Sequence, residues 1–178
     1  MIFLETPLKD ARLIDIEKRE DERGFFARAW CRREFAANGL NPGLAQCNIS
    51  FNPHRGTLRG MHFQDKPFEE AKLVRCTSGS LYDVIIDLWP DSATYLKHLG
   101  AVLTAENRRM LYVPEGFAHG FLTLRDATEV FYQITEFYAP EAQRGVRWND
   151  PAFAIDWPEE PRLISERDRN FPDFHGLV

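Results

Sequence analysis

One histidine, His62, has the residue type and the surroundings for proton-transfer chemistry. It lies in the stretch Arg55–Gln64, RGTLRGMHFQ, which places two arginines, two glycines, one histidine and one amide inside a predicted buried strand. An imidazole with an unperturbed pKa of about 6.5 takes up and releases a proton close to neutrality. A hydrogen-bonded core histidine is the common alternative on a strand, and the residues alone leave both interpretations open.

For Arg59 and His62 to reach the same pocket, the backbone between them must depart from a regular strand. Side chains alternate between the two faces of a strand, so strict alternation points Arg59 and His62 in opposite directions. A β-bulge at Gly60 would re-aim one of them, and glycine inside a strand often marks such a bulge. We therefore predict an irregularity of the strand at Gly60.

Three other segments carry polar groups that a pocket would use. Pro114–Phe121 contains a proline and two glycines and delivers His119 at the end of a constrained turn, a plausible way to fix a functional group. Lys72 faces either solvent, the ordinary place for a lysine, or a pocket that holds an anion. Asp83 and Asp87 lie on one face of a predicted strand, either solvated or paired with a partner.

The sequence does not favour a metal centre. His62, Gln64, Glu70 and His119 are the nearest approach to a ligand set. There is no His-x-His pair, and a glutamine is a poor substitute for an imidazole. We therefore predict neither a metal nor another cofactor.

The elements that would position these residues are short strands. Apolar runs rich in Val, Ile, Phe and Tyr recur every 8 to 12 residues or so, which is typical of an antiparallel sandwich or barrel. A strand within residues 1–20, a turn at Asp21–Gly24 and a second strand over Phe25–Trp30 precede a short helix over Cys31–Asn38. The later strands are predicted at Gln46–Phe51, Leu58–Gln64, Ala71–Thr77, Gly79–Trp89, Leu96–Thr104, Arg109–Val113, His119–Leu124 and Thr128–Phe137.

Bulk properties limit the possible functions. A chain of 178 residues suits one domain, so we expect residues 1–178 to form a single unit, with the tail from Pro140 to Val178 wrapping the same core. The net charge of -5 argues against a nucleic-acid binder. Three cysteines at wide spacing, without a secretory segment or a long apolar run, indicate a reduced, cytoplasmic protein without a membrane role.

Taken together, the motifs resemble one family. The sequence is similar, from Asp21 to about Pro172, to the dTDP-4-dehydrorhamnose 3,5-epimerase family of nucleotide-sugar epimerases. The matching segments are Asp21–Phe26, Arg55–Gln64, the Lys72 segment, Tyr82–Leu88, Pro114–Phe121, Trp148–Pro151 and Ser165–Asp168. Several motifs in the right order make this resemblance far more specific than any one of them.

The resemblance implies a fold and an assembly. The expected fold is all-β, a cupin-type jelly roll, with a short N-terminal helix and a short helical C-terminal region. The family is metal-free and assembles as a homodimer through exchanged N-terminal strands. The expected ligand is a nucleotide-diphosphate sugar.

The resemblance also assigns catalytic roles. In a 4-keto-6-deoxyhexose the hydrogens on C3 and C5 are both α to the carbonyl, so removing either one gives an enolate. His62 would be the base, with Asp168 bound to its other ring nitrogen. Tyr132, which the residues alone would place in the core or at a rim, would protonate the opposite face. Lys72 would stabilise the enolate oxygen.

Binding residues follow from the same resemblance, with two departures. Where the family has glutamates this chain has Arg28 and Gln143, which removes negative charge from the ligand region and leaves the base and the exact sugar open. The predicted function is inversion at C3, C5 or both of a sugar of the dTDP-4-dehydro-6-deoxyglucose type. The alternatives are a ketoisomerase on the same scaffold and a sugar-nucleotide-binding cupin without turnover. The expected substrate-binding residues are Arg23, Phe26, Arg28, Gln46, Asn48, Arg59, His119, Tyr138 and Gln143, with Phe26 reaching across the dimer.

Overall fold

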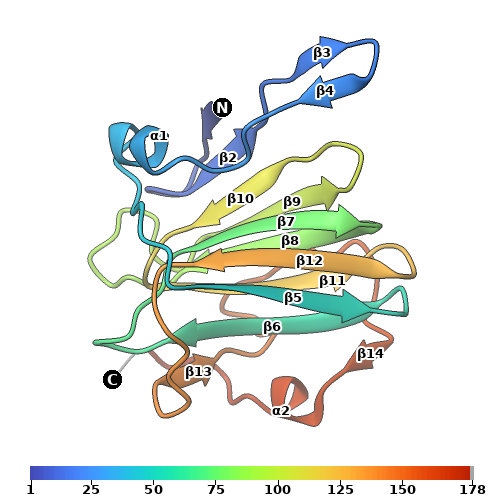
Figure 1. The fold of residues 1–178 in the computed structure, drawn as a ribbon. Coiled ribbons are helices and arrows are strands. Elements are labelled where there is room, and N and C mark those ends of the chain that lie inside the picture. The colour runs from blue at the N-terminus through green and yellow to red at the C-terminus, as the bar shows by residue number, and fades with distance from the viewer. Residues whose placement is uncertain (177–178) are drawn as a thin grey trace.

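Two antiparallel sheets face one another and form a jelly roll (Figure 1). A computed structural model describes residues 1–176, so Leu177 and Val178, the end of the predicted tail, lie outside the described residues. In spatial order the first sheet contains Ile2–Glu5 (β1), Arg12–Asp15 (β2), Met110–Val113 (β10), Lys72–Ser78 (β7), Thr128–Ile134 (β12) and Gln46–Asn52 (β5).

The second sheet faces the first across the core, and in Figure 1 it lies partly behind and partly below the first sheet. Its strands, again in spatial order, are Gln143–Gly145 (β13), Thr57–Gln64 (β6), Phe117–Thr123 (β11), Ser80–Asp87 (β8) and His98–Thr104 (β9). Leu163–Ile164 (β14) pairs in parallel with β6. Arg19–Asp21 (β3) and Gly24–Phe26 (β4) form a separate hairpin, and the two helices are Arg32–Ala37 (α1) and Glu166–Arg169 (α2).

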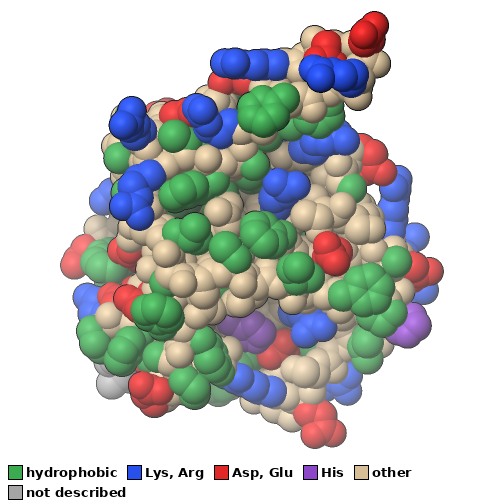
Figure 2. All heavy atoms as spheres, in the orientation of Figure 1, with side chains coloured by type: hydrophobic (Ala, Val, Ile, Leu, Met, Phe, Trp, Pro, Cys, Tyr) green, Lys and Arg blue, Asp and Glu red, His purple; other side chains and the backbone are tan. Residues whose placement is uncertain are grey.

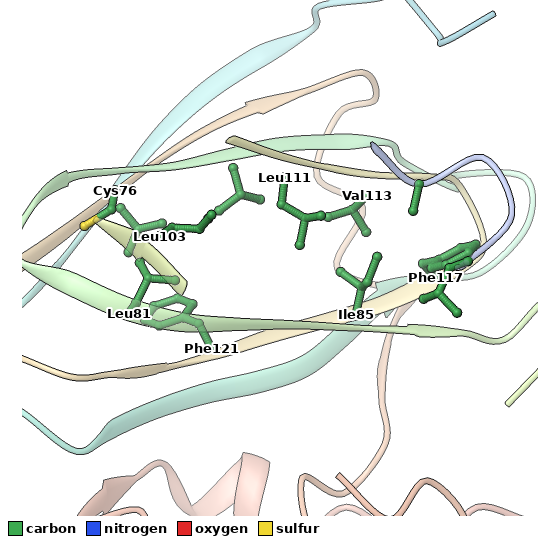
Figure 3. Close-up of a cluster of buried hydrophobic side chains, with 12 residues drawn as sticks. Cys76, Leu81, Ile85, Leu103, Leu111, Val113, Phe117 and Phe121 are labelled. Atoms are coloured by element: carbon green, nitrogen blue, oxygen red, sulfur yellow. The ribbon is translucent and has the colours of Figure 1, made fainter. Parts of the chain in front are cut away.

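The core lies between the two sheets (Figure 3). Alternate residues of β8 and β11, among them Ile85 and Phe121, point into this core, which Leu111 and Val113 enter from the opposite sheet. All four are at most 1% exposed, and burying such a side chain contributes about 1.5 to 3 kcal/mol. This dry region is what holds the strands that carry polar groups in register.

Each sheet is also covered on part of its outer face. α1 lays Phe35 against Tyr112 of β10 in an edge-to-face contact, with ring centroids 6.0 Å apart. Val146 and Phe153, from the C-terminal segment, pack against β8. The segment therefore covers the outer face of the second sheet, and Phe174 is the last of its residues that packs against this cluster.

The predicted strands between residues 46 and 137 are confirmed to within a few residues. The prediction for the N-terminus is wrong in detail. Residues 1–20 contain β1, β2 and the start of β3, because Pro7 interrupts the ladder and Asp10 takes a left-handed φ of 62° that turns the chain back. The strand predicted over Phe25–Trp30 is reduced to β4. In the described part of the chain, no helix is long and apolar enough to cross a membrane.

Candidate functional site

A cavity of about 650 Å³ opens between the two sheets. Figure 2 shows histidine atoms, in purple, recessed below the surrounding side chains between β5 and β6. Residues from β5, β7 and β12 line one side of the cavity, and residues from β6, β11 and α2 line the other. It brings together ten of the predicted site residues: Gln46, Asn48, Arg59, His62, Lys72, His119, Tyr132, Tyr138, Gln143 and Asp168.

The predicted irregularity in β6 is present. His62 lies opposite His119 of β11 and Arg59 lies opposite Phe121, so the register shifts by one residue between the two pairs. Gly60 has a φ of 145°, and a Cβ there would lie 2.6 Å from the Cα of Gly120. Because only glycine fits at this close approach, the strand can turn both Arg59 and His62 into the cavity.

His62 and Asp168 form a dyad. The Nε2 atom of His62 is 2.7 Å from Oδ1 of Asp168, and the backbone N–H of Gly60 donates to Oδ2 at 3.2 Å. The hydroxyl of Ser165 caps α2 by accepting from the backbone N–H of Asp168 at 3.1 Å. The carboxylate is 4% exposed. Residues 106 positions apart thus meet because α2 docks beside β6.

The electrostatics of the dyad suit a base. Burial alone would raise the pKa of Asp168, but the hydrogen bond and the charge of His62 and the N–H of Gly60 hold this pKa below its ordinary value. An ionised carboxylate at Nε2 leaves Nδ1 as the nitrogen that faces a ligand and stabilises the imidazolium once a proton is taken up. The imidazole side chain is 28% exposed, so it is accessible from the cavity.

Lys72 lies in the cavity and not on the surface, where lysines ordinarily lie. It is 8% exposed, and its Nζ is 2.9 Å from Oε1 of Glu70 and 3.5 Å from the carbonyl oxygen of His62. The sequence reasoning considered Glu70 only as a metal-ligand type and missed its pairing with Lys72, although a position two residues earlier in an extended chain places both side chains on one face. Burial next to a carboxylate explains how the ammonium group is accommodated.

Tyr132 is held as a neutral phenol. Burial, followed by the negative charge of Asp83, raises the pKa of Tyr132 well above its ordinary value of 10.0. Its ring meets the ring of His119 edge to face, with centroids 6.1 Å apart. A phenol that stays protonated at neutral pH can donate a proton from the sheet opposite His62.

The two aspartates of β8 are both fully buried, so the solvated interpretation of this face is wrong. Asp83 Oδ1 is 2.7 Å from His119 Nε2, a second His–Asp pair behind the cavity. Asp87 is the last residue of β8, where its carboxylate accepts hydrogen bonds from the hydroxyls of Ser92 and Thr94.

The rim of the cavity carries two arginines bonded to neutral amides. Arg59 Nε donates to Asn52 at 2.8 Å, and Arg167 Nη1 donates to Gln143 Oε1 at 2.8 Å. The Tyr138 hydroxyl donates to the same Oε1 at 2.6 Å. Arg167 was missed by the sequence reasoning, although it directly precedes Asp168.

Three predicted binding residues lie away from the cavity of their own chain. Arg23 pairs with Asp21 at 2.6 Å and Phe26 is 71% exposed, both on the β3–β4 hairpin that projects from the body (Figure 1). Arg28 follows the hairpin and pairs with Glu34 of α1 at 2.7 Å. Their predicted role requires a cavity other than that of their own chain, so it stays a prediction.

Within residues 1–176 no group of three or more His, Cys, Asp or Glu side chains is arranged to hold a metal ion.

The chain is similar to known proteins along nearly its whole length. A relative from Methanothermobacter thermautotrophicus, a dTDP-4-dehydrorhamnose 3,5-epimerase, is 46% identical over 173 residues, which span 95% of this chain and 92% of the relative. The crystal structure of such an epimerase from Elizabethkingia anophelis superposes with a TM-score of 0.95 at 40% identity, covering 98% of this chain and 96% of the other. The crystal structure of the epimerase from Bacillus anthracis, with TDP and PPi bound, superposes with a TM-score of 0.93 at 39% sequence identity. The match covers 97% of this chain and 99% of the other.

The family profile extends over nearly the whole chain. The sequence model of the dTDP-4-dehydrorhamnose 3,5-epimerase family matches residues 5–176, a span that includes every residue of the cavity described above. This chain belongs to the dTDP-4-dehydrorhamnose 3,5-epimerase family.

Proposed function

We propose that this protein is an isomerase that inverts C3, C5 or both of a nucleotide-linked 4-keto-6-deoxyhexose in deoxysugar biosynthesis. The observation that carries the proposal is the placement of the His62–Asp168 dyad and the protonated Tyr132 on the two opposite sheets of one cavity. Inversion needs a base on one face of the sugar ring and an acid on the other.

The reaction follows from the chemistry of the ketone. His62 takes the proton from the carbon next to the C4 carbonyl, and the electron pair of the broken C–H bond forms an enolate. Asp168 stabilises the imidazolium that results. Lys72 stabilises the negative oxygen, a contribution of about 3 kcal/mol or more for a preorganised donor. Tyr132 then delivers a proton to the opposite face of the same carbon.

The rim of the cavity suits the nucleotide part of the substrate. Arg59 lines the cavity, and no acidic side chain among residues 1–176 pairs with it, so it can bind diphosphate oxygens in bidentate fashion. The Tyr138 ring is 54% exposed at the cavity mouth and offers a stacking surface for a base. The presence of TDP and PPi in the structure from Bacillus anthracis supports a thymidine nucleotide.

In this proposal the chain works as a cytoplasmic homodimer with exchanged N-terminal strands. The projecting β3–β4 hairpin presents Arg23 and Phe26 to a second copy of the chain. Ile49 and Phe51, 64% and 55% exposed on the edge strand β5, supply apolar area for contact. The three cysteines are free thiols, which suits a reducing compartment.

Exchange with solvent tests the proposal directly. Incubation of the protein with dTDP-4-keto-6-deoxyglucose in deuterated water is expected to place deuterium at C3, C5 or both, and NMR of the sugar identifies which centre reacts. His62→Ala is expected to abolish this exchange, and Asp168→Asn to slow it by about a thousandfold or more, because the tautomer and the imidazolium lose their support.

Two other outcomes correspond to the alternatives. Binding of the nucleotide sugar without any exchange would favour a non-catalytic binding protein. Migration of the carbonyl to a neighbouring carbon would favour a ketoisomerase. Absence of exchange with every 4-keto nucleotide sugar tried would refute the epimerase.

A further inference from the structure

A second buried His–Asp pair, His119 with Asp83, has no role in the proton relay described above. Asp83 is fully buried on β8, and its Oδ1 lies 2.7 Å from Nε2 of His119 on β11. Its other oxygen, Oδ2, has no hydrogen-bond partner among the described residues. His119 lines the cavity and Asp83 does not, so the carboxylate lies behind the ring as seen by a ligand.

The burial of this pair determines where its hydrogens lie. A neutral imidazole beside an ionised Asp83 would leave a net negative charge on a buried pair, which is costly. The pair avoids this cost as an imidazolium beside an ionised Asp83. In that arrangement Nδ1 of His119 carries a hydrogen.

We propose that Asp83 is a positioning residue for the epimerase: it binds Nε2 of His119 and so holds the Nδ1–H of that ring as a hydrogen-bond donor to an oxygen of the bound sugar. The proposal rests on the proposed function for the identity of the ligand. The edge-to-face contact of 6.1 Å with Tyr132 fixes the plane of the ring from the opposite sheet. Asp83 therefore acts through His119 and does not touch the substrate.

The state of the ring can be measured without turnover. In ¹⁵N-labelled wild-type protein, long-range ¹H–¹⁵N spectra separate protonated from unprotonated imidazole nitrogens, and His119→Asn identifies the signals of His119. The expected result is a protonated Nδ1 at neutral pH. An unprotonated Nδ1 would overturn the proposal whether or not the protein is an epimerase.

Kinetics test the consequence for the reaction. Asp83→Asn keeps the shape of the side chain and removes its charge, and is expected to lower the rate of solvent exchange at C3 or C5 by about tenfold or more, as the loss of an oriented donor does. Asp87→Asn is the matched control, since Asp87 is equally buried on the same strand but bonds Ser92 and Thr94. It is expected to leave the exchange rate of the folded protein unchanged.

A double-mutant cycle separates positioning from a general structural effect. In the His119→Asn background, Asp83→Asn is expected to change the exchange rate by less than about twofold, because coupled residues are strongly non-additive. An effect of Asp83→Asn in the His119→Asn background as large as in the wild-type background would contradict the proposal. So would an effect of Asp83→Asn in the wild-type background no larger than that of Asp87→Asn. Absence of exchange in the wild type would refute the proposed function, and the spectra alone would then decide the state of His119.

Discussion

The cationic side chains around the cavity fall into two groups: some have a carboxylate partner, and others bond only to neutral amides. Lys72 is paired with Glu70 and His62 with Asp168, so the groups near the proposed proton transfers carry their own counter-charges. Arg59 and Arg167 bond to neutral amides, Asn52 and Gln143, and the described residues supply no carboxylate to either. The rim therefore keeps positive charge for an anionic ligand.

The amide of Gln143 leads to a prediction about affinity. Gln143→Glu would place a carboxylate beside Arg167 and Tyr138, where Oε1 now accepts bonds of 2.8 and 2.6 Å. The new charge would neutralise the guanidinium and repel a diphosphate. We expect the KM for the nucleotide sugar to rise about fivefold, equivalent to about 1 kcal/mol, with little change in kcat.

Gln133→Glu is the matched control for that variant. Gln133 follows Tyr132 on β12 and does not line the cavity. Its substitution by Glu changes the net charge of the protein by the same amount as Gln143→Glu. An equal rise in KM for both variants would mean that the total charge of the protein, and not the pair at Arg167, sets the affinity.

The raised pKa of Tyr132, a partly buried residue, predicts how stability depends on alkaline pH. Because its folded pKa lies above the ordinary value of 10.0, its contribution to stability is complete below pH 10.0 and is lost as the pH rises toward the folded value. Urea unfolding on both sides of that pH should show wild type losing stability more steeply than Tyr132→Phe. Tyr112, whose pKa burial raises to about 12, is present in both proteins and cancels. If the stabilities of the two proteins fell in parallel as the pH rises, the raised pKa of Tyr132 would be contradicted.

At the scale of elements, the site depends on how α2 docks. The helix has only four residues and brings Asp168 to His62 through tertiary contacts, since so short a helix is not stable alone. Phe171, just after the helix, packs edge to face against His62 with centroids 6.0 Å apart. Gly145 of β13 lies under this ring and has no side chain to displace it.

Gly145→Ala tests this docking. A methyl group at residue 145 would overlap the Phe171 ring, so the ring and the helix must move. We expect the free energy of unfolding to fall by about 1 to 3 kcal/mol, which is typical of overpacking. We also expect the rate of deuterium exchange to fall, because Asp168 moves away from His62. Chemical denaturation and the deuterium assay measure the two effects. In the Gly145→Ala variant, a second substitution Phe171→Leu makes room for the added methyl group and should recover part of the stability. If stability does not recover, the strain does not come from the overlap with Phe171.

At the scale of the whole molecule, the projecting hairpin predicts a shared site. Phe26 is not among the residues that line the cavity of its own chain, and it is 71% exposed. If it completes the cavity of a partner subunit, Phe26→Ala and His62→Ala will each be weakly active or inactive alone. A mixed dimer will contain one cavity with both native residues, and so will recover activity.

Co-expression of the two variants with different tags, followed by purification of the mixed dimer, measures this complementation. The expected activity is about half that of wild type, because one of two sites is intact. An inactive mixed dimer, or a wild-type protein that is monomeric by light scattering, would contradict the exchange of N-terminal strands.

The expectation of a single domain over residues 1–178 stays a prediction at this scale. It is supported by strands from both halves of the chain alternating within each sheet, as in the order β10, β7, β12 and β5. One cooperative thermal transition would agree with it.

Several features were decided by the sequence alone. The turn residues between short apolar runs predict the strands from β5 to β12, because alternation and turn chemistry are local properties. The glycine inside the His62 strand predicts the bulge, because no other residue allows that backbone to approach its neighbour. The order of motifs along the chain was sufficient to indicate the family.

Other features required the tertiary structure. The burial of Lys72, the pairing of Asp83 with His119 and the contact of Arg167 with Gln143 join residues that are apart in sequence or ordinary on the surface. The raised pKa of Tyr132 comes from burial and from a charge on another strand. Electrostatics depend on distance and desolvation in three dimensions, which the spacing of residues along a chain does not contain.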